Sequence, residues 1–325
     1  AQSTDWRTGL YCGAILNVFE RCGDFLEIGG PALFLRHTSA QAWDNAFINF
    51  DHRTWFPAPN YVVMKLWRKH YAPQRVALTG ADRVVAVSNE SRKEILEHFD
   101  IRPERVTVLY NGVDLSVWNR IETDATRKAY GIDGPYILFV GRTTRQKGMT
   151  HLLDAMRHVP PPTRLVCCTS APDTPEIEQE IAAKVGEHPD RVVWINTLLR
   201  EDQYIELYSH CAVFCCPSVY EPFGIINLEA MACERPVVAS AVGGIKEVVV
   251  PEETGLLVPP GEPEALAEGL NRILKDPDRA REMGRKGRAR VEERFSWTAI
   301  AKQTRAMYEE VVRERKEAAK GPKKV

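Results

Sequence analysis

The strongest constraint on the fold is an alternation of two kinds of segment from about residue 81 onward. Short runs rich in β-branched residues alternate with longer amphipathic runs, which is the pattern of strands connected by helices. The short runs are apolar on both faces, as strands between two helix layers are. They cover residues 83–88, 105–110, 136–141, 163–169, 191–195, 212–217, 236–240 and 255–259. The sequence therefore predicts an α/β fold with a Rossmann-like, doubly wound parallel sheet.

The longer runs predict helices, most clearly at residues 149–158, 176–188, 201–210 and 225–232. After Pro260 the pattern is helical through Glu317, and a basic tail follows. Residues 1–80 differ in composition, because Trp, Phe, Asn and Pro are frequent there. This part is expected to form loops and short elements, including a helix at 61–71 with Asn60 as its N-cap.

The composition argues for a local binding site. The chain has 325 residues, enough for two domains, and its formal net charge of -1 gives it no global attraction to nucleic acid or a membrane surface. No apolar run reaches the roughly 18 residues of a membrane span, and the start AQSTDWRTG lacks the features of a signal peptide. We therefore expect a cytoplasmic protein.

Cysteine and aspartate patterns do not indicate a metal site. Cys167, Cys168, Cys215 and Cys216 lie inside apolar runs, where we expect buried, reduced thiols. No C-x-x-C pair offers zinc ligands. The DPD stretch at residues 276–278 lies between two predicted helices and is interpreted as an N-cap and turn.

Basic residues follow the predicted strand that ends at Gly141. Arg142, Arg145 and Lys147 come directly after it, in the stretch FVGRTTRQKGMTHLLDAM. Open α/β sheets bind their ligands at the carboxyl ends of the strands. The stretch therefore predicts an anion site, with a solvated charge cluster as the alternative. It is not a P-loop, because GxxxxGK[ST] is absent.

A second motif, SVYEPFGIINLEAMA, carries Glu221 and Glu229 in an otherwise apolar run. A helix is expected to begin here, so the backbone amides of residues 223–226 are free to hold phosphate or sugar oxygens. Gly224 allows a ligand to approach the backbone closely. Glu229, about a turn and a half into the helix, suits a ribose diol. The competing interpretation is a buried ion pair with Arg235.

Three stretches, VGRTTRQKG, ADRVVAVSNESRKEIL and SVYEPFGIINLEAMACERPVVASAVGG, resemble family 4 glycosyltransferases of the GT-B fold, and most closely bacterial glycogen synthases. The resemblance covers about residues 78–312 and implies the C-terminal half of a GT-B fold, with a truncated, irregular N-terminal part. It implies a retaining hexosyltransferase that needs neither a metal nor a cofactor. The donor would be ADP-glucose or UDP-glucose, and the acceptor an α-glucan or other carbohydrate.

The same resemblance implies roles for individual residues. The catalytic residues would be Arg142 and Lys147, which neutralise the leaving diphosphate, and Glu221, which lies beside the transferred sugar. Fixed cations and amide dipoles suit this reaction because negative charge develops on the diphosphate. Glu229 would hold the ribose. The other donor-binding residues would be Gly141, Phe223, Gly224, Ile225 and, beside the base, Leu199.

The N-terminal part resembles a different family. Residues 8–75 are similar to the segment near the end of the catalytic barrel in family 51 α-L-arabinofuranosidases, so we interpret the chain as chimeric. Such a fragment lacks its neighbouring strands, and we expect it to pack on the rest of the chain or to form a homo-oligomer. The expected divisions are an arabinofuranosidase-like fragment at 1–77, a remnant of the GT-B N-terminal domain at 78–118, a nucleotide-sugar-binding domain at 119–296 and a crossover helix with the basic tail at 297–325.

Two other functions compete with glycosyl transfer, so the sequence leaves enzymatic activity undecided. A glycoside hydrolase needs two carboxylates across a sugar site, and the fragment offers Glu20, Asp24, Glu27, Asp44 and Asp51. The catalytic glutamates of the arabinofuranosidases lie earlier in their chain, so Glu20 and Glu27 do not inherit that role. The other alternative is a non-catalytic binding module that oligomerises through its N-terminal segment.

Overall fold

The computed structural model describes residues 35–37, 48–50, 55–57, 81–170 and 172–319. The chain divides into two compact units. Unit 1 comprises residues 1–86 and 92–108, and unit 2 comprises residues 87–91 and 109–325. Within the described ranges, no helix combines the length and the apolar character that crossing a membrane requires.

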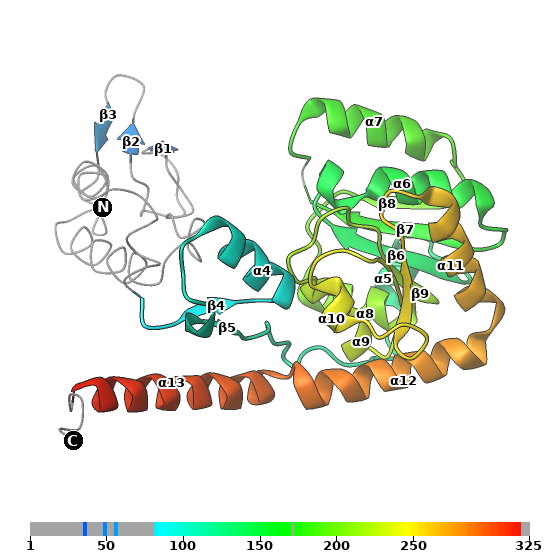
Figure 1. Ribbon diagram of the computed structural model, residues 1–325. Helices are drawn as coiled ribbons and strands as arrows, with labels where there is room; N and C mark the ends of the chain where they lie inside the picture. The colour runs from blue at the N-terminus through cyan, green and yellow to red at the C-terminus, as the bar shows by residue number, and fades with distance from the viewer. Residues whose placement is uncertain (1–34, 38–47, 51–54, 58–80, 171, 320–325) are drawn as a thin grey trace. The chain divides into compact units, whose positions relative to one another are not determined.

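Unit 2 is built on a six-stranded parallel sheet of order β11-β10-β9-β6-β7-β8 (Figure 1). Its strands all lie inside the runs predicted from the sequence: β6 (Tyr136–Gly141), β7 (Arg164–Thr169), β8 (Val192–Ile195), β9 (Val213–Cys216), β10 (Val237–Ser240) and β11 (Gly255–Val258). The chain adds β7 and β8 on one side of β6 and the later strands on the other. The boundary between β6 and β9 is therefore the topological switch point, where open α/β sheets bind ligands.

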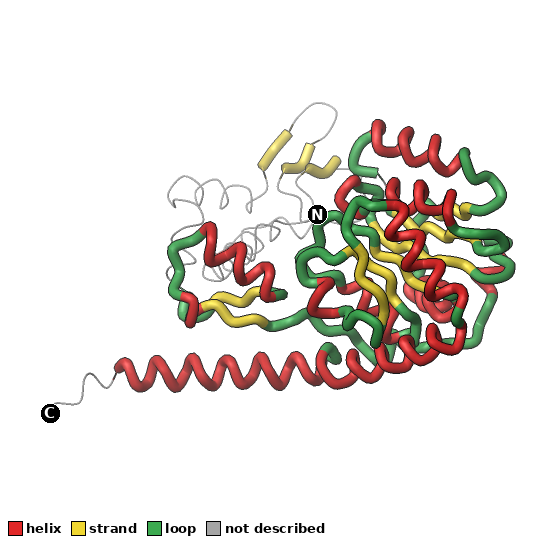
Figure 2. Tube along the Cα trace, turned by 45° about the vertical axis from the view of Figure 1, so that its right-hand side comes forward, coloured by secondary structure: helices red, strands yellow, loops and turns green. Residues whose placement is uncertain are grey.

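Helices cover both faces of this sheet (Figure 2). One core contains Ile137 and Phe139 of β6 with residues of α6, α7 and α11, and the other contains Tyr136 and Leu138 with residues of α8 and α9. This division confirms the doubly wound α/β fold. The helices of unit 2 are α5 (Ala125–Ala129), α6 (Met149–Ala155), α7 (Pro175–Gly186), α8 (Glu201–His210), α9 (Ile225–Ala232), α10 (Ile245–Val248), α11 (Pro263–Lys275), α12 (Pro277–Arg294) and α13 (Trp297–Ala319), with short 3-10 turns η3 (Arg145–Lys147) and η4 (Met156–His158).

The DPD stretch is a helix start, as the sequence predicts. The Asp276 side chain accepts a hydrogen bond from the backbone amide of Arg279 at 3.0 Å, and Pro277 occupies the first turn of α12. This is the arrangement of an N-cap followed by a first-turn proline. In the part of the chain that the structure describes, no three His, Cys, Asp or Glu side chains are grouped to hold a metal ion.

The prediction of buried, reduced thiols is also confirmed. Cys167, Cys168, Cys215 and Cys216 are buried and free, on β7 and β9. Burial raises the pKa of the Cys168 thiol to about 12, so it stays protonated and behaves as a small apolar side chain.

Unit 1 contains two small sheets in its described residues. The strands β4 (Val84–Ala86) and β5 (Val106–Val108) pair in parallel, and β5 follows a 3-10 turn, η2 (Pro103–Arg105). A second sheet contains β1 (Leu35–His37), β2 (Ile48–Phe50) and β3 (Trp55–Pro57), with β2 parallel to β1 and antiparallel to β3. Helix α4 (Asn89–His98) begins in unit 2 and continues in unit 1. The predicted helix at 61–71, its cap Asn60 and all five candidate hydrolase carboxylates lie outside the described residues.

Candidate functional site

Three loops of unit 2 meet at the carboxyl edge of the sheet, after the neighbouring strands β6, β9 and β10. Hydrogen bonds join them in series. The backbone amide of Val219 donates to Gln146 O at 2.9 Å, and the Gln146 side chain donates to Tyr220 O at 3.0 Å. The amide of Gly244 donates to Glu221 O at 3.1 Å. Residues 142–148, 217–224 and 241–244, called the three-loop site below, are therefore held together at the switch point.

Two glycines make this close approach possible. Gly148 has φ 70°, and a Cβ there would lie 2.0 Å from Pro217 O. Gly243 has φ 46°, and a Cβ there would lie 1.9 Å from Glu221 O. Both residues combine the left-handed backbone that favours glycine with a backbone contact that excludes any side chain.

The site brings Lys147 and Glu221 together. The Lys147 Nζ lies 2.5 Å from Glu221 Oε2, and the two side chains are only 15% and 10% exposed. Because both charged groups are largely shielded from water, each is stabilised mainly by the other and little by solvent. A basic residue of the first predicted motif thus meets an acidic residue of the second.

The other two basic residues of the first motif have different surroundings. Arg145 makes an ion pair with Glu180 of α7, with Nη2 2.7 Å from Oε2. Arg142 is exposed, and its guanidinium makes neither an ion pair nor a hydrogen bond within the described part of the chain, although its backbone carbonyl accepts from the amide of Thr144 at 2.9 Å. Of the cluster predicted from the sequence, Arg142 is therefore the cation left without a protein partner among the described residues.

Gly141 is the last residue of β6 and stands beside the pair. A Cβ on Gly141 would lie 3.2 Å from the Phe139 ring and 3.7 Å from Lys147 Cγ. The absence of a side chain therefore leaves the backbone at the end of β6 close to the Lys147 stem.

Helix α9 starts inside the three-loop site with open backbone amides. Gly224 has φ 88° and forms the N-cap. The amides of Phe223, Gly224, Ile225 and Ile226 have no acceptor among the described residues. Phe223 is buried and Ile225 is exposed, so the helix start lies at the protein surface. The predicted anion-binding amides are thus present and unpaired.

The surroundings of Glu229 favour its neutral form, and no cation pairs with it among the described residues. Its Oε2 accepts a hydrogen bond from the Tyr208 hydroxyl at 3.1 Å, and burial raises its pKa to about 7. Arg235 instead donates to Cys211 O at 3.3 Å. Since Glu229 has no ion pair among the described residues, the alternative of a Glu229–Arg235 salt bridge is wrong. Tyr208 was not found from the sequence, because nothing local connects it to Glu229.

Leu199 lies in the segment that precedes α8. Its side chain is only 6% exposed and belongs to the core, whereas the adjacent Leu198 is 88% exposed. The loop therefore presents Leu198 to solvent. Sequence reasoning also missed a glycine pair, Gly243 and Gly244 of the stretch AVGG, which packs against Glu221 in the site. Two adjacent glycines after a strand are the signal that could have indicated it.

Two family models match the chain. The model described as "Glycosyl transferases group 1" matches residues 122–290, and the model described as "Glycosyltransferase Family 4" matches residues 28–117. Since the first match covers more than half of the chain, the chain belongs to the group 1 glycosyl transferases. The second match includes most of residues 8–75, and these matches do not show the arabinofuranosidase resemblance expected there.

Individual relatives agree with the family. An α-maltose-1-phosphate synthase from Mycolicibacterium smegmatis is 45% identical over 253 residues, which are 73% of this chain and 65% of the relative. A sucrose-phosphate synthase from Thermosynechococcus elongatus has a TM-score of 0.65 at 34% identity, covering 74% of this chain and 61% of that one. Anabaena HepE in complex with UDP-glucose has a TM-score of 0.65 at 25% identity, covering 73% and 67%. The chain thus spans just under two thirds of the length of the curated relative it matches at 45% identity.

Proposed function

We propose that the chain is a retaining, metal-independent glycosyltransferase that transfers glucose from ADP-glucose or UDP-glucose to a carbohydrate acceptor. The observation that carries the proposal is the three-loop site, which brings together the Lys147–Glu221 pair, the open amides of α9 and the loop that carries Arg142. The likeness to a structure solved with UDP-glucose supports a nucleotide-sugar donor. The proposal includes residues 119–296 as the donor-binding domain and residues 297–325 as the crossover helix and tail.

The diphosphate of the donor needs positive charge that does not move during the reaction. Arg142 and the amides at the start of α9 supply unpaired donors for its oxygens. Lys147 supplies a cation whose position is set by Glu221. Because such groups are fixed before the reaction, they stabilise the leaving diphosphate with little reorganisation. Glu221, at the same point, is the residue proposed to lie beside the transferred glucose.

The nucleoside would occupy the other part of the site. The Glu229 carboxylate, oriented by Tyr208, is proposed to accept hydrogen bonds from the ribose hydroxyls. Gly141, Gly224 and Ile225 contribute backbone, and the Leu199 segment would flank the base.

Calorimetric titration with ADP, UDP and their glucose conjugates tests this proposal. Arg142→Ala is expected to weaken binding about 10-fold or more, because it removes a charge-assisted contact to phosphate. Arg145→Ala is the matched control, since Glu180 already engages that guanidinium, and its affinity should stay within about 3-fold. Absence of binding at millimolar ligand, or equal losses in both variants, would contradict the proposal.

The acceptor has two candidates. The resemblance to glycogen synthases favours an α-glucan, whereas the names of two relatives, α-maltose-1-phosphate synthase and sucrose-phosphate synthase, favour a phosphorylated sugar. Incubation with radiolabelled donor and either a maltodextrin or glucose 1-phosphate separates them. Label in the polymer supports the first acceptor, and label in a phosphorylated disaccharide supports the second.

The two alternative functions, glycoside hydrolysis and non-catalytic binding, have no support from the geometry of the described residues. All the candidate hydrolase carboxylates lie outside the described residues, and the family match at 28–117 gives most of that segment to a glycosyltransferase model. Homo-oligomer formation through the N-terminal segment is a proposal that sedimentation tests, by comparing the full chain with one beginning at residue 78.

A further inference from the structure

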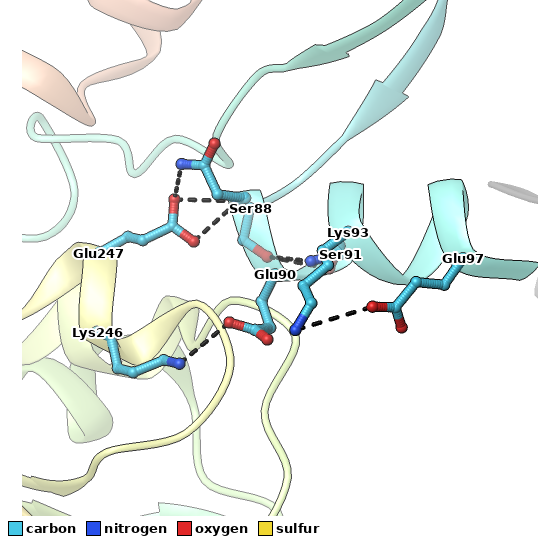
Figure 3. Close-up of polar contacts among 8 residues, drawn as sticks. Ser88, Glu90, Ser91, Lys93, Glu97, Lys246 and Glu247 are labelled. Atoms are coloured by element: carbon cyan, nitrogen blue, oxygen red, sulfur yellow. Dashed lines mark hydrogen bonds and ion pairs between the residues drawn. The ribbon is translucent and has the colours of Figure 1, made fainter. Parts of the chain in front are cut away.

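Glu247 of α10 binds the start of α4. Its two carboxylate oxygens accept hydrogen bonds from the backbone amide of Asn89, at 2.8 Å to Oε1 and 3.1 Å to Oε2. The Oε2 atom also accepts a hydrogen bond from the Asn89 side-chain amide at 2.5 Å. It also accepts the Tyr110 hydroxyl at 3.0 Å. Figure 3 shows Glu247 directed toward the first turn of α4. All of these residues belong to unit 2. The carboxylate thus caps a helix that is distant in the sequence.

The backbone of Glu247 is held as firmly as its side chain. Arg290 of α12 donates to Glu247 O at 2.7 Å and to Val248 O at 2.9 Å, where α10 ends. Immediately before α10, the Gly244 amide donates to Glu221 O. Helix α10 is therefore fixed at its end by Arg290 and connected at its beginning to the three-loop site.

Tyr110 continues the connection to Phe223, in the 217–224 loop of the three-loop site. Its ring stacks on Phe223, with centroids 5.7 Å apart, and meets the edge of Phe295 at 5.3 Å. Burial and the hydrogen bond to Glu247 raise the pKa of Tyr110, so its hydroxyl remains a donor. A continuous path of contacts therefore runs from Asn89 through Glu247 and Tyr110 to Phe223.

The path lies where the chain passes between its units. The boundaries fall at residues 86/87, 91/92 and 108/109, and Asn89 and Tyr110 lie within a few residues of them. We propose that Glu247 is a positioning residue for glycosyl transfer: it holds the segments that lead into unit 1 fixed beside the three-loop site. This inference rests on the proposed function. Transfer between two substrates requires a fixed geometry, so loosening these segments should slow transfer without weakening donor binding.

Glu247→Ala in the full chain tests the proposal with three measurements. The Asn89 amide, whose described acceptor is Glu247, should exchange with solvent about 10-fold faster or more. The turnover number should fall about 10-fold or more, while donor affinity stays within about 3-fold. Glu247→Gln keeps one acceptor oxygen and should recover part of both losses.

Lys246→Ala is the matched control on the same helix. Lys246 pairs with Glu90 of the same α4 turn at 3.0 Å, but both side chains are substantially exposed, so its loss should change little. Unchanged Asn89 exchange in Glu247→Ala, or turnover and donor affinity falling together, would overturn the proposal. If Glu247→Ala does not fold, Tyr110→Phe must show the same separation of turnover from affinity, or the proposal fails. If no donor and acceptor react, the proposed function fails, whereas the exchange measurement still decides whether Glu247 holds α4.

Discussion

Replacing Glu229 with glutamine should stabilise unit 2 in a strictly pH-dependent way. Burial raises the pKa of Glu229 from 4.5 to about 7, so the folded state favours its neutral form. Below the pKa of Glu229 in the unfolded chain, the group is protonated in both the folded and the unfolded state, and its contribution to the free energy of unfolding is fully present. As the pH rises, the unfolded state ionises first, and stability is lost until the pH passes the folded pKa. A shift of this size corresponds to a loss of at most about 3 kcal/mol.

Glutamine has no such ionisation and its side-chain oxygen still accepts from Tyr208. The free energy of unfolding, from urea titrations between pH 4 and pH 8, should therefore differ little between Glu229→Gln and the parent at pH 4, which lies below the unfolded pKa. The difference should grow to about 2–3 kcal/mol at pH 8. Glu268→Gln, at an exposed position of α11, is the control and should follow the parent at every pH. A constant difference for Glu229→Gln across this range would refute the reasoning.

Two further predictions concern the same site. Gly148→Ala should destabilise unit 2 by about 2 kcal/mol or more and abolish donor binding, because its Cβ would meet Pro217 O at a positive φ. Gly186→Ala, at a position with open space around it, is the control and should have neither effect. Thermal unfolding and calorimetry measure both variants, and equal effects would count against the three-loop site. Tyr208→Phe removes a hydrogen bond that lowers the pKa of Glu229, so the carboxylate should form at a higher pH than in the parent. The pH at which donor affinity rises should therefore move upward. An unchanged pH profile of donor affinity would show that Glu229 does not act as a carboxylate toward the donor.

The strands and most helices were predictable because their signals are local. Runs such as 136–141 are apolar on both faces, and this property follows from neighbouring residues alone. The same holds for the cap at Asp276 and for the open start of α9. Arg142 and Lys147 could be proposed as site residues because a basic loop after a strand is a recognisable pattern. The origin expected for residues 8–75 rested on resemblance alone, and the family match over most of that segment points to a glycosyltransferase.

The sequence alone determined the α/β class, the order of the elements and the residue types at the edge of the sheet. Only the tertiary structure decided which of those residues meet. Lys147 and Glu221 are 74 positions apart, and they pair because β9 lies directly beside β6, an adjacency that no local pattern encodes. Arg145 forms an ion pair with Glu180 and Arg142 does not, although both are arginines of the same loop in the sequence. Glu247 accepts hydrogen bonds from Asn89 across 158 positions for the same reason, because polar contacts depend on distance in space, and folding sets that distance.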